Sequence, residues 1–191
     1  MRNVVMMAGL IAMLWSAGGW ADAVLVAEKS AIRFVSVKNA SVAEVHHFSN
    51  LKGSINQEGR VNVNIPLVDV ETNIPVRNER MREMLFEIAS FASASIEADV
   101  ELPALLAMDS GDYTSMNVFF ELNLHGKTQM LSSKVSVARL GDELHVTTLA
   151  PLVINVASFD LADGVERLRE VAGLKNIATA VPVTAILVFK L

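Results

Sequence analysis

The stretch TSMNVFFELNLHGKTQMLSSKVSVARL, residues 114–140, decides the fold of this chain. Its first half carries apolar residues at every second position, namely Met116, Val118, Phe120, Leu122 and Leu124. A period of two predicts a strand with one buried and one solvated face, which is typical of antiparallel sheet. His125 and Gly126 then interrupt the alternation before a second strand begins. Glycine adopts positive φ without penalty, so these two residues predict a tight hairpin.

His125 is therefore interpreted as a turn residue whose ring is at least partly exposed to solvent. The alternative is a metal-binding or acid/base role, which needs partners gathered in a cluster. His46 and His47 do not supply one, because neighbours on a strand point to opposite faces. His145 lies in a separate segment. We predict no metal site and no cofactor.

The same alternation recurs along the rest of the chain. It is strongest in residues 94–102 and 181–191. Weaker strands are predicted at residues 31–37, 60–70, 132–140 and 143–155. Turn-forming residues separate several of these segments, as at Gly59 and Gly141.

Two segments have the spacing of amphipathic helices instead. The first, residues 76–88, has an apolar stripe at Met81, Met84, Leu85 and Ile88. In the second, residues 163–173, Asp163 and Glu166 have the spacing of a capping box, and Gly173 stands where a helix would end. Many strands and two short helices predict an all-β fold. We expect a closed antiparallel β-barrel of about eight strands, capped by the amphipathic helices.

The N-terminal residues have the pattern of a secretory signal peptide. Arg2 precedes an apolar run from Val4 to Trp15, and small residues follow it. The run is too short for the roughly 20 residues that cross a bilayer. We predict a cleaved signal peptide over residues 1–21, with cleavage after Ala23 as the alternative, and one domain over residues 24–191. The mature protein is expected in the periplasm.

The amino-acid composition and the absence of known motifs argue against several classes of function. The net charge is −5 without a long basic stripe, so nucleic acid is not an expected partner. The chain has no cysteine, so neither a disulfide nor a cysteine nucleophile is available. It also lacks a G-x-S-x-G elbow, an H-E-x-x-H motif and a phosphate loop. We predict that the protein is not an enzyme. A hydrolase whose site is assembled from distant strands is the alternative.

Four motifs in order resemble one family. LNLHGKTQ at residues 122–129 is similar to LTLHGVTK, and ETNIPVRNERMR at residues 71–82 is similar to DTNNxxRDxHLR. LFEIASFA at residues 85–92 and HFSNLKGSI at residues 47–55 are similar to FFDVxxYP and FxxFxGxI. The sequence thus resembles the YceI-like family, periplasmic lipid- or polyisoprenoid-binding proteins with a lipocalin-like barrel. It departs from the family pattern at Lys29-Ser30, Asn78, Arg80, Ala92 and residues 155–160, which indicates a divergent member.

The resemblance implies an apolar lumen that holds an isoprenoid or a fatty amphiphile. The residues expected to line it lie on the apolar faces of the predicted strands: Phe34, Ile96, Val118, Phe120, Leu122, Val183 and Leu187. Alternation alone equally predicts a lumen filled by side chains, as in a stress-response or interaction barrel without a ligand. A homodimer and transient contact with a membrane are both compatible with the carrier role.

Arginines on the two predicted helices add a second hypothesis. Arg77 and Arg80 are candidates for binding an anionic headgroup at the barrel mouth, because guanidinium groups bind phosphate in a bidentate manner. The remaining candidates of this kind are Arg82, Arg167 and Arg169. The alternative is a solvated helix face, since acidic residues such as Glu79 and Glu166 lie beside them.

Overall fold

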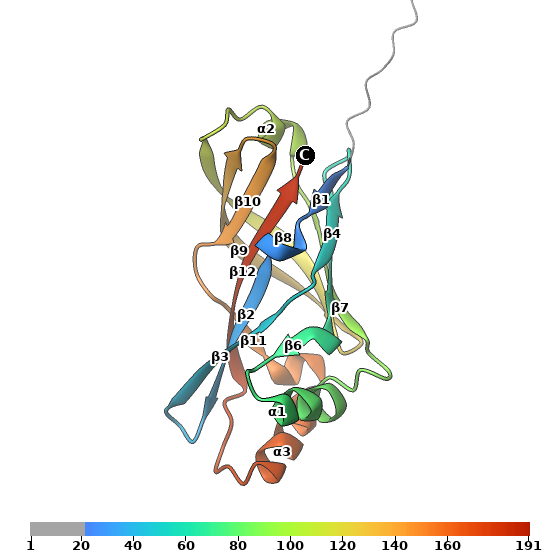
Figure 1. Ribbon diagram of the computed structural model, residues 1–191, viewed down its shortest axis with the longest axis vertical. Helices are drawn as coiled ribbons and strands as arrows, with labels where there is room; N and C mark the ends of the chain where they lie inside the picture. The colour runs from blue at the N-terminus through green and yellow to red at the C-terminus, as the bar shows by residue number, and fades with distance from the viewer. Residues whose placement is uncertain (1–21) are drawn as a thin grey trace, which may run out of the picture.

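The alternating segments form the wall of a closed antiparallel barrel in the computed structural model, which describes residues 22–191 (Figure 1). The predicted signal peptide lies outside the described residues. The strands are β1 Ala23–Leu25, β2 Ala31–Lys38, β3 Val42–Phe48, β4 Lys52–Ile55, β5 Arg60–Pro66, β6 Val70–Glu71, β7 Ser93–Asp99, β8 Tyr113–Leu124, β9 Lys127–Leu140, β10 Glu143–Thr148, β11 Leu152–Asn155 and β12 Ala180–Lys190. The prediction of an eight-stranded antiparallel barrel with short helices is confirmed.

Neighbours in the barrel follow the order of the chain. The wall runs β1–β4–β5–β7–β8–β9–β10–β12, and β12 returns to β1 through Val24 opposite Lys190 and Leu25 opposite Phe189. Closure removes the free sheet edges that invite aggregation. The long β8–β9 hairpin contains the alternating stretch of residues 114–140, and its register pairs Leu124 with Lys127 around the turn.

The first strand of the barrel is interrupted by a short 3₁₀ turn, η1 (Ala27–Lys29), which separates β1 from β2. The side chain of buried Ser30 bridges this interruption with two hydrogen bonds. Its hydroxyl accepts a hydrogen bond from the Val188 amide of β12 at 3.0 Å and donates one to the Val26 carbonyl at 2.8 Å. Beyond this point β12 pairs with β2, placing Val183 opposite Phe34. The β2–β3 hairpin then extends past the barrel, as Figure 1 shows at the lower left.

Helices lie at both ends of the barrel. Helix α1 (Pro75–Arg80) continues into a π-helical turn, η3 (Met81–Leu85), and packs with α3 (Ala162–Val171) at the end where the β2–β3 hairpin projects (Figure 1). Helix α2 (Leu102–Leu106) lies at the opposite end, with Leu102 and Leu105 buried against the core. The remaining short turns are η2 (Leu67–Asp69) and η4 (Val156–Phe159).

Five local expectations need correction. The single strand predicted over residues 143–155 is two strands, β10 and β11, separated at residues 149–151. The strand predicted over residues 60–70 ends at Pro66 and gives way to η2. The strand predicted over residues 94–102 ends at Asp99, and helix α2 follows, because Pro103 suits the first turn of a helix. The helix predicted over residues 76–88 reaches only Leu85, and its second half is π-helical.

The capping box predicted for the second helix is also absent. Leu161 is the N-cap of α3, and it makes no side-chain cap hydrogen bond. Glu166 instead accepts hydrogen bonds from Arg169 one turn further along. The predicted C-terminal stop is correct, since Gly173 follows the helix with a φ of +62°.

Candidate functional site

The interior of the barrel is a cavity of about 550 Å³ with predominantly apolar walls. This volume falls within the range of roughly 300–1,000 Å³ that is usual for small-molecule sites. All seven residues predicted to line the lumen lie on its wall, contributed by four different strands: Phe34, Ile96, Val118, Phe120, Leu122, Val183 and Leu187. Their contact with a ligand stays a prediction.

Several wall residues face inward yet are not fully buried. Four of them pack against the core cluster and are still of intermediate exposure: Ile96, Val118, Val183 and Leu187. Side chains that filled a barrel at the density of a protein interior would be sealed from solvent. The partial exposure of these four residues therefore marks a lumen with room beside them.

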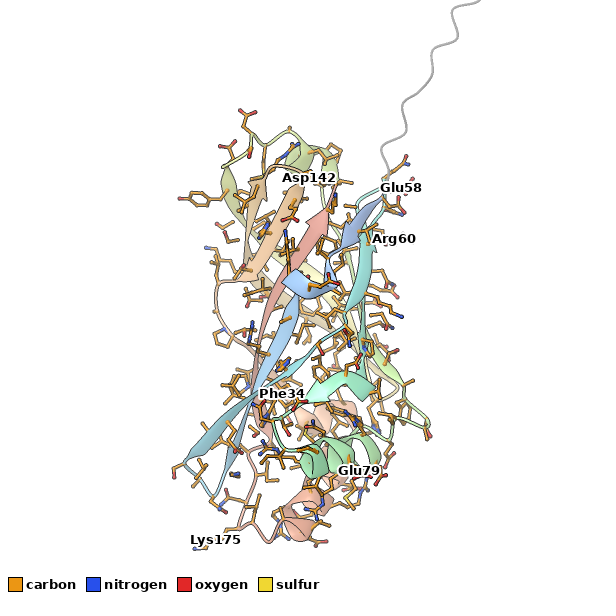
Figure 2. The ribbon with its side chains drawn as sticks, in the orientation of Figure 1. Phe34, Glu58, Arg60, Glu79, Asp142 and Lys175 are labelled. Atoms are coloured by element: carbon orange, nitrogen blue, oxygen red, sulfur yellow. The ribbon has the colours of Figure 1, made fainter. Side chains whose placement is uncertain are left out.

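The cavity opens at the end where α1 lies. Two of its lining residues there, Ile74 and Val76, are 41 % and 51 % exposed. Leu174 and Ile177, in the segment after α3, line the same end. Figure 2 shows Phe34 near the level where the β2–β3 hairpin leaves the barrel, with Glu79 of α1 and Lys175 at that end of the molecule. We call this opening the mouth.

Polar residues reach the cavity from the inner face of the β2–β3 hairpin. On β2 the inward positions run from Phe34 to Ser36 and Lys38, and on β3 they include Glu44 and His46. Sequence reasoning selected Phe34 but missed the other four. The same period of two that placed Phe34 inside also places Ser36 and Lys38 inside, so the signal was present in the sequence.

Glu44 holds two cations at the mouth. Its Oε2 atom lies 2.7 Å from Lys38 Nζ and 2.8 Å from Arg77 Nη1. The hydrogen bond from Lys38 lowers the pKa of the Glu44 carboxyl, and the charge of Arg77 adds to the effect. We call Lys38, Glu44 and Arg77 the ion triplet. Its net charge is one positive unit.

A buried hydrogen-bond network sets the position of Arg77. Asn78 and Thr72 are 5 % and 2 % exposed, and the Thr72 amide donates to Asn78 Oδ1 at 2.9 Å. Asn78 Nδ2 donates to Glu71 at 3.0 Å, and Arg77 Nη2 donates to the Thr72 carbonyl. Because buried polar groups need partners, these contacts fix the start of α1 and hold Arg77 toward Glu44.

Arg80 differs from Arg77. Both residues line the cavity at the mouth, as the headgroup hypothesis requires. Among the described residues, however, the Arg80 side chain makes no ion pair or hydrogen bond, whereas the Arg77 side chain is bonded to Glu44 and Thr72. Arg82 is not part of the cavity wall, and Arg167 and Arg169 pair with Glu87 and Glu166.

His46 lies one inward position deeper than Glu44. It is 2 % exposed, and its Nε2 atom is 2.8 Å from Ser36 Oγ. Its ring is 5.1 Å from the ring of Phe34, which in turn stacks on Phe48 at 5.4 Å. Burial lowers the pKa of His46 to about 4, and the positive charge of Arg77 contributes in the same direction. The imidazole is therefore neutral at neutral pH.

His125 occupies the predicted turn, with φ of +52° at His125 and +72° at Gly126. Positive φ at both central residues is the geometry of a tight two-residue hairpin. The ring is only slightly exposed, with 10 % of the side-chain surface accessible to solvent. The ring packs 4.3 Å from that of Phe91, and its Nε2 atom lies 3.3 Å from Glu87 Oε2.

Glu87 joins three elements of the helical end. Besides His125 of the β8–β9 turn, it accepts a hydrogen bond at 2.7 Å from Arg167 of α3. Arg167 also donates to the Met84 carbonyl of η3 at 2.6 Å. These contacts connect the helices to the barrel wall. His125 thus contributes to the packing of the helical end against the barrel. The described part of the chain contains no cluster of three or more potential metal ligands.

Taken together, the closed antiparallel wall, the apolar cavity and the polar mouth define a small β-barrel of the lipocalin-like type. The chain belongs to the YceI-like family, whose YceI-like domain matches residues 24–189.

Two solved structures illustrate the similarity. A polyisoprenoid-binding domain from Saccharophagus degradans, implicated in plant cell wall breakdown, is 36 % identical, with a TM-score of 0.86 over 88 % of this chain and 97 % of that one. BcnA from Burkholderia cenocepacia is 17 % identical, with a TM-score of 0.66 over 86 % of this chain and 98 % of that one, and supports the fold alone. No curated protein sequence matches the chain.

Proposed function

We propose that this protein is an exported carrier that holds the apolar chain of an isoprenoid or fatty amphiphile in the lumen of its barrel. The observation that carries the proposal is the cavity of about 550 Å³ with apolar walls. Each methylene group buried in such a site contributes about 0.8 kcal/mol, so an apolar chain needs no directional chemistry to bind. The polyisoprenoid-binding neighbour from Saccharophagus degradans supports this choice of ligand class.

The predicted lumen residues would contact the chain. Ile96, Val118 and Phe120 project from β7 and β8, while Phe34 and Val183 face one another across the β2–β12 pairing. The partial exposure of Val118 and Val183 favours this role over a lumen filled by side chains. Leu122 and Leu187 complete the proposed contact set.

At the mouth, Arg80 is the cation best placed to meet an anionic headgroup. Its side chain lines the cavity without a partner in the described structure, whereas Arg77 is held in the ion triplet. The exposed apolar side chains of Ile74 and Val76 lie at the same rim. This combination suits transient contact with a membrane while a lipid enters or leaves.

Mass spectrometry of organic extracts from the purified protein tests the carrier role. We expect an isoprenoid or acyl compound in near-stoichiometric amount, and rebinding of that compound by the delipidated protein. Extracts without such a compound, together with a delipidated protein that binds neither an isoprenoid nor a fatty acid, would refute the proposal. A turnover assay on the recovered compound would reveal a hydrolase instead.

Export is the second part of the proposal, and it depends on the signal-peptide pattern of residues 1–21. No helix within the described residues is long and apolar enough to cross a membrane. We expect a periplasmic protein whose N-terminus begins just after Ala21 or Ala23. N-terminal sequencing checks this, and recovery of a cytoplasmic protein that retains Met1 would contradict it.

A further inference from the structure

The inner face of the β2–β3 hairpin changes from apolar to polar over three inward positions. Phe34 and Phe48 belong to the apolar core, and Glu44 belongs to the ion triplet at the mouth. Ser36 and His46 lie between these two zones. The pair therefore lies inside the cavity, at the boundary between the apolar walls and the charged mouth.

His46 brings an unpaired polar atom to this boundary. Its Nε2 atom is hydrogen-bonded to Ser36, but Nδ1 is buried without a hydrogen-bond partner in the described structure. An unsatisfied buried nitrogen is costly, because no hydrogen bond offsets the loss of its contact with water. The fold tolerates this cost on the wall of a cavity large enough for a ligand, and a ligand group could remove it.

We propose that Ser36 and His46 form a recognition site inside the cavity that takes an uncharged hydroxyl group of the bound lipid. The proposal rests on the carrier function above and specifies the chemistry of its ligand. The ligand would place its chain among the apolar walls and a hydroxyl at the boundary, below the ion triplet.

The chemistry of the imidazole favours a hydroxyl group. A neutral imidazole donates through one nitrogen and accepts through the other. A hydroxyl both donates and accepts, so it satisfies Nδ1 of His46 whichever nitrogen carries the proton. The Ser36 hydroxyl retains further hydrogen-bonding capacity, because within the described residues its one side-chain hydrogen bond is to His46.

An anion fits this position less well. Lys38 and Arg77 already share the Glu44 carboxylate, so neither offers a free charge to a group beside His46. Since burial keeps the pKa of His46 low, the ring itself supplies no positive charge at neutral pH. An anionic group on the ligand would instead lie further out, at Arg80.

Competition binding with three probes of one chain length tests the site. The probes are geranylgeraniol, the hydrocarbon of the same chain, and geranylgeranyl phosphate, each displacing a fluorescent fatty acid from the delipidated protein. We expect the wild type to bind the alcohol about 5–10-fold more tightly than the hydrocarbon, as one added hydrogen bond implies. His46→Leu should reduce that ratio to near one without changing the affinity for the hydrocarbon.

Matched variants separate recognition from structure. His47→Leu changes the neighbouring residue on the outer face and should leave the ratio unchanged. His46→Gln restores a side chain that donates and accepts, and should recover part of the preference. Melting temperatures of all variants establish that each is folded.

Two outcomes are informative. An unchanged alcohol-to-hydrocarbon ratio in His46→Leu overturns the inference and leaves the carrier intact. Failure of the wild type to bind any of the three probes or the fluorescent fatty acid would refute the carrier function itself.

Discussion

At the scale of single residues, His46 links burial in the cavity to the pH dependence of folding. The folded protein keeps its imidazole neutral down to a pKa of about 4, whereas an unfolded histidine protonates near pH 6.5. Between these values the unfolded chain binds the additional proton, so the free energy of unfolding must fall as the pH falls. Above pH 6.5 neither the folded nor the unfolded state binds the additional proton. His46 therefore does not make the stability depend on pH in that range.

We predict that this histidine removes on the order of 1–3 kcal/mol of stability between pH 6.5 and pH 4. The charged groups that face it are Glu44, Lys38 and Arg77. The lowered pKa of Glu44 confines its own contribution to the acid end. Urea unfolding of wild type and His46→Gln at several pH values isolates the effect, because the variant should lose less stability on acidification. Parallel pH profiles for the two proteins would show that His46 is not responsible.

His125 and Gly126 yield a second prediction at this scale. His125→Asn should cost about 1 kcal/mol, because it loses the contact with Glu87 while asparagine tolerates positive φ. Gly126→Val should cost more, about 1–3 kcal/mol from backbone strain alone. Its Cβ atom would also approach Phe91 Cε1 to 2.9 Å. Urea unfolding measures both. A His125→Asn protein of full stability that binds no lipid would instead indicate a direct role in ligand binding.

At the scale of elements, the packing of α3 on η3 depends on the absence of a side chain at Gly164. An added Cβ atom would lie 2.8 Å from the Met84 carbonyl oxygen and 3.0 Å from Leu85 Cα. Alanine normally stabilises a helix interior by roughly 1 kcal/mol relative to glycine. Here the sign should reverse, because both neighbouring atoms belong to the backbone and cannot move aside.

We therefore predict that Gly164→Ala lowers the free energy of unfolding by about 1–3 kcal/mol, the usual cost of overpacking. The control is Glu170→Ala on the exposed face of the same helix, which should change stability by no more than about 0.5 kcal/mol. Urea unfolding of the two variants decides the matter. Stabilisation by Gly164→Ala would mean that α3 moves freely on η3.

Sequence reasoning predicted elements best where one face is buried throughout. The strong alternation at 114–124 and 181–191 corresponds to β8 and β12, whose side chains alternate between lumen and solvent. Reasoning failed where tertiary contacts override local signals. Asp163 has capping-box spacing, yet helix α3 begins beside Leu161 against the core, where packing determines its start. Helix α2 was also missed. It is too short to show a helical periodicity, and it directly follows a segment with strong strand alternation.

The site was predicted only in part, for a related reason. Apolar alternation identified the seven wall residues because a lumen and a core demand the same pattern. Polar lumen residues break that pattern, so Ser36 and His46 were passed over. The two histidines were correctly assigned to opposite faces of β3, but only packing showed that the face of His46 is the lumen. Pairing of Arg77 with Glu44 joins residues from separate elements and likewise needed the fold.

At the scale of the whole molecule, the decisive property is whether the lumen holds a chain or only completes a core. Val118 and Val183 lie on the cavity wall at intermediate exposure, contributed by β8 and β12. Replacing either valine with phenylalanine adds volume to the lumen without introducing a charge. The two functions predict opposite consequences for such a change.

If the lumen binds lipid, Val118→Phe and Val183→Phe should remain folded and lose extractable lipid, because the new ring occupies space that the chain would fill. If the lumen is a packed core, overpacking should cost roughly 1–3 kcal/mol of stability with no lipid to lose. Val153→Phe is the matched control, since Val153 is 60 % exposed and is not among the cavity-lining residues. Melting temperature and extracted lipid, measured on the same samples, separate the two. Retention of wild-type lipid by both lumen variants would show that the chain binds elsewhere, and the carrier assignment of this cavity would then be wrong.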